Sequence, residues 1–305
     1  MNYKYRDLVK VCLKNLKEAL LDMEQGIGHN VNGCAGENTG EVWEPRFQKV
    51  HFQEPRLEGG LPQARLQYET IVVDNASNDG IRDMLGKNFP EVKFIALDKN
   101  RGYGGGNNAG IKAAKGKYIL ILNPDVTILK GAIEKMYTFM EKNPRVGILG
   151  PQLLNPDGTI QPSCMRFYKF FTPIYRRISF LHYFPFVKKE LARFEMDDFD
   201  HKKNQEIEDW IFGPCLMLRK EALDKVGGFD ERFLLFFEDT DLCRRFKLAG
   251  WRIYYLAEAK VIHMDERLSQ KSKGLKALQH KTTWIHISSW IKYFWKWRKT
   301  RTIRG

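Results

Sequence analysis

The chain has 305 residues with a formal net charge of +13, and 43% of its residues are hydrophobic. This length accommodates one large α/β domain with an appendage, and the basic excess favours anionic partners such as nucleic acid, a membrane surface or phosphorylated small molecules. The sequence contains no run of roughly 18 apolar residues, no signal peptide and no CxxC pair among its five cysteines, which argues against a spanning helix and a disulfide framework. We therefore expect a cytosolic-facing protein with free thiols.

The first predicted element is an amphipathic helix, because apolar residues recur at helical spacing over residues 7–21. Residues 22–67 then lose all periodicity and are rich in Gly, Asn, Glu and Pro, which predicts a flexible insertion or a functional lid. His29 and Cys34 lie in this stretch, but no second pair at ligand spacing supports a metal site.

Strands and helices alternate after this insertion. A β-branched strand is expected over residues 70–74, ending in Asp74, and a turn with capping residues leads into a helix over residues 81–87. A strand over residues 92–97 precedes a glycine-rich turn, which opens a helix running to Lys115. Glycines at a helix start let backbone amides approach a phosphate or a sugar, although glycines also serve tight turns.

The continuous apolar run at residues 118–122 predicts a short strand covered on both faces. Pro124 ends it, so Asn123 and Asp125 are expected at the carboxyl edge of the sheet, where ligands bind in open α/β sheets. A carboxylate in that place is a candidate metal ligand. With a helix at residues 130–142 and a strand at 146–149, the pattern predicts a mostly parallel sheet covered by helices on both faces.

Residues 162–208 are rich in Phe, Tyr, Arg and Lys, and we interpret them as an acceptor-side region or as partly buried surface helices. Strands are expected at residues 213–219, 252–256 and 260–262, with a helix at 220–226. Three acids, Glu238, Asp239 and Asp241, open a further helix directly after two phenylalanines. Acids in a first turn commonly complement the helix dipole, but adjacent aromatic rings also raise the proton affinity of a carboxylate, which suits a general base.

The order of these motifs carries a resemblance. The motifs are Asp74 after its strand, the glycine- and asparagine-rich turn at residues 100–110, Asn123-Pro124-Asp125, Gly227-Gly228-Phe229-Asp230-Glu231, Glu238-Asp239-Thr240-Asp241, Gly250-Trp251 and His263 at the end of a strand. In this order they closely resemble the family 2 inverting glycosyltransferases, in particular the rhamnosyltransferase-like branch. The resemblance implies the GT-A type fold, which binds nucleotide-diphosphate sugars.

The resemblance also implies roles for individual residues. Asp239 resembles the catalytic base, with Glu238 and Asp241 as supporting carboxylates. Asp125 resembles the metal-ligand acid of the DXD motif, whose first acid is replaced here by Asn123, and His263 resembles the family's additional ligand; hard oxygen ligands with one imidazole suit Mn or Mg. A histidine that merely ends a strand remains the alternative for His263. The implied donor-binding residues are Asp74, Asn75, Ser77, Asp79, Asn100, Gly102, Gly106, Asn107 and Asn123.

By this resemblance we expect a metal-dependent inverting glycosyltransferase of the hexosyltransferase type. It would move a sugar, rhamnose in the branch it resembles, from a nucleotide-diphosphate donor to a hydroxyl of a cell-surface polysaccharide or lipid-linked glycan. Three alternatives stay open: a nucleotidyltransferase, whose basic glycine-rich signature is not seen; a non-enzymatic nucleic-acid-binding module; and a glycosyltransferase-like binding module with impaired activity. We expect no nucleic-acid partner, and the sequence does not indicate an oligomeric state.

Family members normally begin with an apolar strand ending in a polar-Tyr pair, and only Asn2-Tyr3 matches its end here, so the first strand is expected to be truncated. We assign residues 1–265 to the catalytic domain and residues 266–305 to a basic aromatic tail. The tail has no acid after Glu266, and its lysines, arginines and tryptophans fit an amphipathic helix. Such a helix is expected to anchor the enzyme peripherally on the inner face of the cell membrane, or else to pack on the catalytic domain or on a second subunit.

Overall fold

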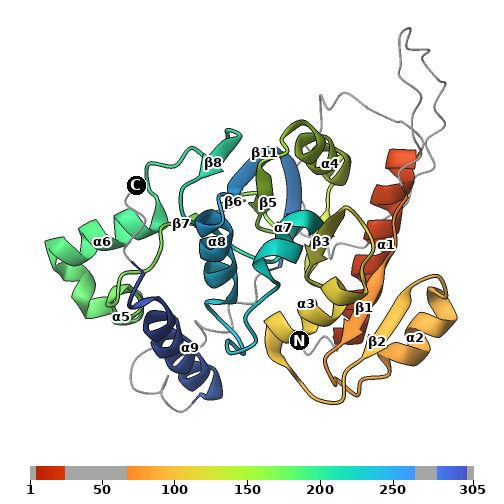
Figure 1. Ribbon diagram of the computed structural model, residues 1–305, viewed down its shortest axis with the longest axis horizontal. Coiled ribbons are helices and arrows are strands. Elements are labelled where there is room, and N and C mark those ends of the chain that lie inside the picture. The colour runs from red at the N-terminus through yellow and green to blue at the C-terminus, as the bar shows by residue number, and fades with distance from the viewer. Residues whose placement is uncertain (1–4, 25–66, 265–279, 301–305) are drawn as a thin grey trace, which may run out of the picture.

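The computed structural model describes residues 5–24, 67–264 and 280–300 (Figure 1). The insertion predicted at residues 22–67, including His29 and Cys34, lies almost entirely outside the described residues. Asn2 and Tyr3, at the expected end of the first strand, also lie outside them.

The order of helices and strands follows the predicted alternation closely. The helices are α1 (Tyr5–Glu24), α2 (Ile81–Asn88), α3 (Gly102–Ala113), α4 (Ala132–Lys142), α5 (Thr172–Arg177), α6 (Pro185–Glu195), α7 (Lys220–Val226), α8 (Glu238–Leu248) and α9 (Lys281–Trp297), with a 3-10 helix, η1 (Ser179–Tyr183), between α5 and α6. The strands are β1 (Ile71–Asp74), β2 (Lys93–Ala96), β3 (Tyr118–Leu122), β4 (Val126–Ile128), β5 (Val146–Leu154), β6 (Ile160–Gln161), β7 (Cys164–Met165), β8 (Gln205–Ile207), β9 (Trp210–Ile211), β10 (Cys215–Arg219) and β11 (Arg252–His263).

The central sheet has the strand order β3-β10-β5-β11-β4, and β6 and β8 pair with β5 and β11. Strands β3, β5 and β11 run in one direction, while β10 and β4 run against their neighbours. The prediction of a mostly parallel sheet is therefore wrong, and the sheet is mixed. Strand β10 starts at the carboxyl end of β3, where Cys215 pairs with Leu122. A strand that begins at this end of the sheet must run antiparallel to β3, because a parallel strand would have to begin at the amino end of β3.

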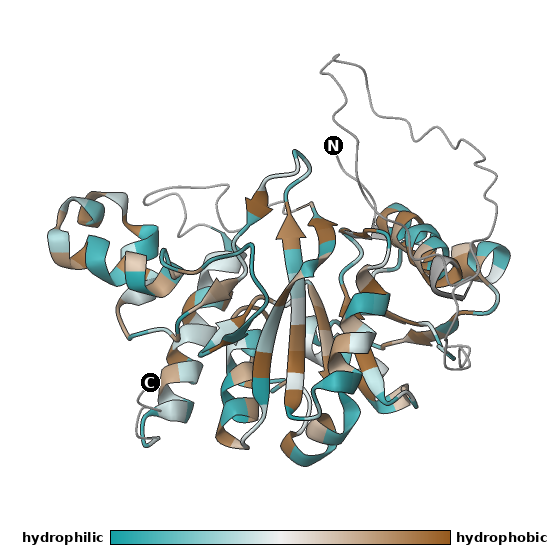
Figure 2. Ribbon diagram, turned by 90° about the horizontal axis from the view of Figure 1, so that it is seen from above, coloured by the Kyte–Doolittle hydropathy of each residue, from teal (hydrophilic) through white to brown (hydrophobic). Residues whose placement is uncertain are grey.

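Helices cover the sheet on both faces, as predicted. On one face, α1 and α4 enclose a core that contains Met136, Met140 and Leu149. On the other face, α7 and α8 enclose a larger core around Ile148 and Phe246. Figure 2 shows hydrophobic residues concentrated along the central strands, between these helices.

Strands β1 and β2 form a separate parallel sheet of two strands, packed with α2 and α3. In the part of the chain that the structure describes, β1 pairs with no strand other than β2. All four residues of β1 are only half-buried, which is unusual for a parallel strand. This small sheet lies at the opposite side of the molecule from α9 (Figure 1).

Strand β11 is longer than predicted, because the two strands expected at residues 252–256 and 260–262 form one strand with an irregularity between Leu256 and Lys260. Its partner β5 likewise continues past Pro151 to Leu154. The extension carries both strands beyond the carboxyl end of β3, and β4 pairs with the far end of β11. This pairing decides which side chains meet at the edge of the sheet.

Candidate active site

The pairing of β4 with β11 brings Asp125 and His263 together. His263 lies opposite Val126 in the register, and the Met264 amide donates to the Asp125 carbonyl at 3.0 Å. The His263 Nε2 atom is 3.6 Å from Asp125 Oδ2, too far for a direct hydrogen bond. The other oxygen, Asp125 Oδ1, is buried and has no hydrogen-bond partner in the described part of the chain.

The tautomer of His263 is fixed by Gln161 of β6. The Nδ1 atom of His263 lies 2.8 Å from Gln161 Oε1, and an amide oxygen can only accept, so Nδ1 carries the proton. Gln161 Nε2 lies 3.4 Å from Asn155 Oδ1, which fixes the orientation of the amide. In the neutral ring the lone pair is then on Nε2, the atom 3.6 Å from Asp125 Oδ2, which is the tautomer that binds a metal ion through Nε2.

These two side chains fit one shared divalent cation. Two ligands that are each about 2.1 Å from one ion lie less than about 4.2 Å apart, a condition that the 3.6 Å separation meets. An orphaned buried carboxylate oxygen beside an imidazole lone pair is the donor set expected for Mn or Mg. No group of three or more His, Cys, Asp or Glu that could hold a metal occurs among the described residues, so such a cation needs oxygen ligands from water or substrate.

The segment 212–214 connects this pair with the acidic helix start. The Phe212 ring packs edge-on against the His263 ring, with centroids 5.8 Å apart, and Pro214 accepts a hydrogen bond from the Asn123 amide at 2.9 Å. Between them, Gly213 lies against the Asp239 side chain, since a Cβ on this glycine would be 3.5 Å from Asp239 Cβ and 3.7 Å from its Oδ2 atom. The side chain of Tyr103 donates to the Gly213 carbonyl at 2.7 Å and so holds the segment in place. One short segment therefore touches both groups of candidate residues.

Asp239 lies in the first turn of α8, directly after two residues with a strained backbone. Phe236 and Phe237 both have left-handed φ values, 68° and 67°, a conformation that costs a non-glycine residue on the order of 1–3 kcal/mol. Burial of Phe237 against Phe233 and Tyr293 maintains this conformation. The strained pair turns the chain so that α8 begins with its carboxylates at the edge of the sheet.

Burial changes the proton affinity of the two adjacent acids. It raises the pKa of the half-buried Asp239 to about 6, although the amide of Thr240 donates to its carboxylate at 2.7 Å. Burial and the neighbouring Asp239 charge raise the pKa of Glu238 well above its usual range, and its Oε2 atom has no partner within the described residues. Because each charge disfavours the other, the two acids titrate as one coupled pair.

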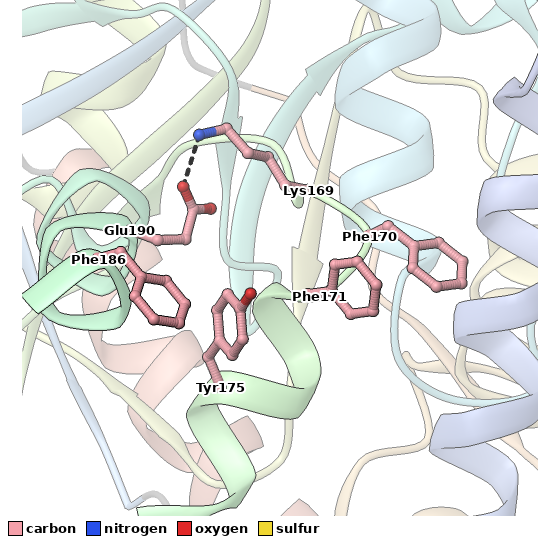
Figure 3. Close-up of a pocket in the computed structure, with 6 residues that line it drawn as sticks. All are labelled: Lys169, Phe170, Phe171, Tyr175, Phe186 and Glu190. Carbon is pink, nitrogen blue, oxygen red and sulfur yellow. Dashed lines mark hydrogen bonds and ion pairs between the residues drawn. The ribbon is translucent and has the colours of Figure 1, made fainter. Parts of the chain in front are cut away.

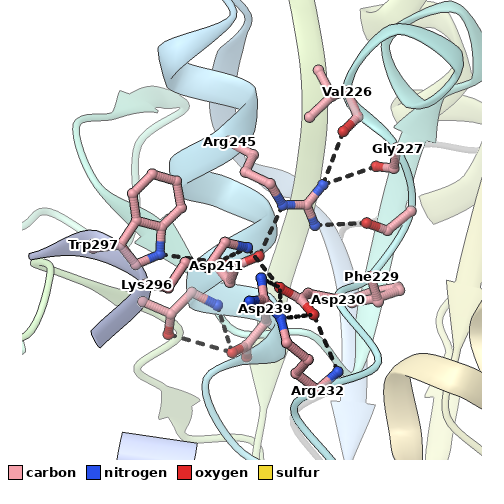
Figure 4. Close-up of polar contacts among 12 residues, drawn as sticks. Val226, Gly227, Phe229, Asp230, Arg232, Asp239, Asp241, Arg245, Lys296 and Trp297 are labelled. Carbon is pink, nitrogen blue, oxygen red and sulfur yellow. Dashed lines mark hydrogen bonds and ion pairs between the residues drawn. The ribbon is translucent and has the colours of Figure 1, made fainter. Parts of the chain in front are cut away.

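Asp241 has a structural environment instead. It is completely buried, and its two oxygens bind Arg245 at 2.8 Å, Lys296 at 2.6 Å and Trp297 Nε1 at 2.9 Å (Figure 4). Lys296 also binds Asp230 at 2.7 Å. We call the contacts of Lys296 and Trp297 with Asp230 and Asp241 the α9 clasp. Because both oxygens of Asp241 are occupied, this acid fastens α9 to α8 and does not face the candidate site.

The predicted donor-binding residues of the first turn lie together after β1, and several are committed to protein contacts. Asp74 Oδ1 accepts from the Ser77 amide at 2.9 Å, and Ser77 Oγ donates to Asp79 at 2.8 Å. Asp79 also accepts from the amides of Ile81 and Arg6, so it caps α2 and ties down α1. Asp74 keeps one oxygen with no contact to these neighbours.

The second group of predicted donor-binding residues forms the glycine-rich turn. Asn75 connects it to the first turn, because it accepts from the Arg101 amide at 2.8 Å and donates to the Gly102 carbonyl at 2.9 Å. A Cβ on Gly102 would lie 2.1 Å from the Leu234 carbonyl oxygen, so this glycine is required for close backbone packing. Of the remaining members, Asn100 lies just before α3, Gly106 and Asn107 lie within α3, and Asn123 follows the end of β3.

Comparison with known proteins identifies the chain's family. The family model described as glycosyl transferase family 2 matches residues 54–227, more than half of the chain. The chain belongs to glycosyltransferase family 2. A second model, described as the N-terminal domain of galactosyltransferase, matches residues 197–267 and so includes the start of α8 and His263.

Relatives of this family 2 glycosyltransferase include an N-acetylglucosaminyl-diphospho-decaprenol L-rhamnosyltransferase from Mycobacterium tuberculosis, 28% identical over 82% of this chain and 86% of that protein. A low-salt glycan biosynthesis hexosyltransferase from Haloferax volcanii is 24% identical over 73% of this chain and 75% of that protein. Among solved structures, GalNAc-T7 with UDP, GalNAc and Mn2+ aligns with a TM-score of 0.47 and 14% identity. That alignment covers 64% of this chain but only 37% of the longer protein.

Several residues of the glycosyltransferase that contact the candidate site were missed from the sequence. Gln161, Tyr103 and Gly213 act through hydrogen bonds to partners far along the chain, and no local spacing signals them. Asn108 was visible only as part of a motif, yet it accepts from the Phe229 amide at 2.8 Å and donates to Glu231 at 3.1 Å. It thereby joins the glycine-rich turn to the loop before α8, two motifs that the sequence showed only in order.

Proposed function

We propose that this family 2 glycosyltransferase moves a sugar, with rhamnose as the candidate, from a nucleotide-diphosphate donor to a hydroxyl of a glycan or lipid-linked glycan, with inversion at the anomeric carbon. The observation that carries the proposal is the contact of segment 212–214 with both His263 and Asp239. A donor diphosphate beside Asp125 and His263 and an acceptor hydroxyl beside Asp239 would then meet across a few residues. The rhamnosyltransferase relative supports the choice of sugar and of a lipid-linked acceptor.

In this proposal Asp239 is the general base. The acceptor hydroxyl oxygen forms a bond to the anomeric carbon, its proton passes to the Asp239 carboxylate, and the bond from that carbon to the diphosphate oxygen breaks. A pKa of about 6 keeps Asp239 ionised at neutral pH while leaving it more basic than an exposed aspartate. Burial and the Asp239 charge raise the pKa of Glu238, which disfavours a second negative charge on the pair.

Asp125 and His263 would hold a divalent cation, Mn or Mg, in this proposal. Bound there, the cation would offset the charge that the departing nucleotide diphosphate gains. Gln161 keeps the His263 lone pair directed toward that position. Asp74, Ser77 and the turn that Asn75 connects would face the nucleotide.

We further propose that the enzyme acts at the inner face of the cell membrane as a peripheral protein, with the catalytic domain at residues 1–265 and the basic tail at 266–305. No helix in the described ranges is long and apolar enough to span a membrane. Helix α9 buries Tyr293 on the catalytic domain and exposes Trp284, Ile291 and Trp295. Exposed tryptophans on a helix without acids favour contact with anionic lipid.

The test combines donor binding with transfer. We expect Mn2+ together with the correct nucleotide diphosphate to raise the melting temperature of the parent chain by mass action, and Asp125→Ala to lose this shift. Asp239→Asn should keep the shift and lose about 10²–10⁴-fold in transfer rate, because only the base is removed.

Three results would contradict the proposal. An Asp239→Asn variant that no longer binds nucleotide would make this acid structural. Equal activity of Asp239→Asn and the parent would remove it as the base. No shift with any nucleotide, in a chain that melts cooperatively, would favour the alternative of a glycosyltransferase-like binding module.

A further inference from the structure

A row of aromatic rings runs along the arm formed by α5, η1 and α6 (Figure 3). Successive ring centroids lie 5.2 to 6.2 Å apart, in the order Phe184, Phe186, Tyr175, Phe171 and Phe170. We call these five residues the aromatic row. Aromatic rings at such distances normally fill a core, but here Phe186 is 61% exposed and Phe171 55% exposed.

The arm presents further exposed apolar groups beside the row. Tyr183 is 84% exposed and Phe180 64% exposed, although a water-soluble surface gains nothing from such large rings. Contiguous apolar surface of this kind marks an interaction site. The exposed rings of the arm therefore fit an interaction site.

The aromatic row rests on a rigid support, so its exposure is not a result of loose packing. Glu190 of α6 is buried and accepts from Lys169 at 2.6 Å, from Thr172 at 2.7 Å and from Arg193 at 2.7 Å. Although burial alone would raise the pKa of Glu190, these hydrogen bonds lower it to about 2. The charged cluster holds the start of α5 against α6 and fixes the row in place.

The row continues directly into α9. Phe170 lies 4.9 Å from the Trp290 ring and 5.2 Å from the Phe294 ring, and Trp290 Nε1 donates to the Phe170 carbonyl at 3.0 Å. A second contact joins the arm to α9, because Arg177 donates to Thr283 at 2.9 Å. Two segments more than one hundred residues apart in the sequence thus form one aromatic surface.

The charges of the two segments identify the class of partner. Residues 158–189 contain no Asp or Glu, and neither do residues 280–300. Basic residues are interspersed with the rings in both segments, including Arg176, Lys188 and Lys189 in the arm, Lys292 in α9 and Lys299 just after it. Large exposed rings with exclusively basic companions are complementary to an anionic bilayer, into whose interface rings insert while lysine and arginine meet phosphate.

We propose that the arm formed by α5, η1 and α6 is a second membrane-docking element, which binds an anionic lipid surface together with α9. This inference rests on the proposed membrane contact of α9 and deepens it, because it assigns to the arm a role that α9 alone would otherwise carry. Two rigidly joined elements bind one surface more tightly than either does alone, since the second contact is intramolecular. They also fix the orientation of the catalytic domain on the bilayer.

The experiment measures flotation of the full chain with vesicles of phosphatidylcholine containing phosphatidylglycerol, and with vesicles of phosphatidylcholine alone. The arm variant is Phe180→Ser, Tyr183→Ser and Phe186→Ser together. The matched control is Val11→Ser, Tyr68→Ser and Leu248→Ser, three exposed apolar residues in other elements. All variants are first required to melt at the parent temperature.

We expect the parent and the control to bind the anionic vesicles equally, and the arm variant to bind them at least about tenfold more weakly. Binding of the parent should fall with rising salt and be weaker on neutral vesicles. The inference is overturned if the arm variant binds like the parent, if the control loses binding equally, or if neutral and anionic vesicles bind alike. Transfer to a water-soluble acceptor, measured on the same samples, tests the glycosyltransferase activity separately.

Discussion

Burial makes Asp239 the most informative side chain for the pH dependence of the reaction. Its pKa of about 6 predicts that kcat/KM rises through about pH 6 and is lost below it, because only the ionised carboxylate can accept the acceptor's proton. A pH–rate profile checks this expectation. An acidic limb near the ordinary value of 3.8 would mean that water solvates Asp239 in the working enzyme.

The raised pKa of Asp239 also makes the stability of the folded chain depend on pH. Because the folded-state pKa exceeds the unfolded value of 3.8, the folded chain binds the proton more tightly. The stabilisation from Asp239 is thus fully present below pH 3.8 and is lost as the pH rises through about 6. A neutral asparagine avoids this loss, so Asp239→Asn should not unfold more readily than the parent at pH 7.

Gln161 provides a separate test of the cation site. We expect Gln161→Leu to weaken Mn2+ binding by about 10- to 100-fold, since the His263 ring loses the acceptor that fixes its tautomer. Water-proton relaxation measures this without any turnover. Gln152→Leu is the matched control, because Gln152 is equally buried but donates to the His201 carbonyl. Equal loss in both variants would show a general effect of removing a buried amide.

At the scale of elements, α9 packs on α8 and on the loop before it. The sequence predicted an amphipathic helix there and allowed for packing on the domain, but it gave no buried partner for Lys296. In the structure Lys296 instead enters the α9 clasp with Asp230 and Asp241. The predicted apolar face is also divided, with Phe294 packed inward and Trp295 exposed. Helical periodicity alone cannot reveal this, because the buried partners lie more than fifty residues earlier.

The clasp yields a prediction for stability. We expect Lys296→Met to lower the free energy of unfolding by on the order of 1–3 kcal/mol, because Asp241 is fully buried and loses one of its cationic partners. Denaturant unfolding measures the loss. Lys299→Met, an exposed lysine in the next turn, should unfold like the parent. If the two variants are equally stable, the clasp does not hold α9 in solution.

The strands were predicted far better than their directions. The apolar run of β3 and the alternation of strands and helices could be located from local composition alone. The antiparallel course of β10 could not, because it depends on the end of the sheet at which the chain arrives after residues 162–208. The length of β11 was missed for a similar reason, since residues 257–259 have no strand signal of their own and lie in the irregularity between the two stretches that pair with β5.

At the scale of the whole molecule, the site combines residues that the family resemblance could order but not connect. The resemblance named Asp125, His263 and Asp239, and the structure brings the first two within 3.6 Å through the register of β4 and β11. The spacing of the motifs in the sequence does not predict that segment 212–214 contacts both His263 and Asp239. It also does not predict that Asp241 joins the α9 clasp. These contacts depend on which buried polar atom finds a partner after folding.

The separation of β1 and β2 from the central sheet predicts uneven local stability. Their backbone hydrogen bonds join only two half-buried strands, whereas β5 and β11 lie in a buried sheet. We expect amides of β1 and β2 to exchange with solvent faster than those of β5 and β11 under native conditions. Hydrogen exchange with mass spectrometry checks this, and equal protection of both regions would contradict it.

The α9 clasp also constrains the order of events during translation. Trp297 is synthesised 56 residues after Asp241. A nascent chain that has just completed α8 therefore has Arg245, but not yet Lys296, as a cationic partner for Asp241. Until Lys296 and Trp297 are synthesised, α8 lacks the contacts of the α9 clasp. A transcript cut short before residue 281 would therefore encode α8 and still yield a polypeptide in which Asp241 never meets Lys296 and Trp297.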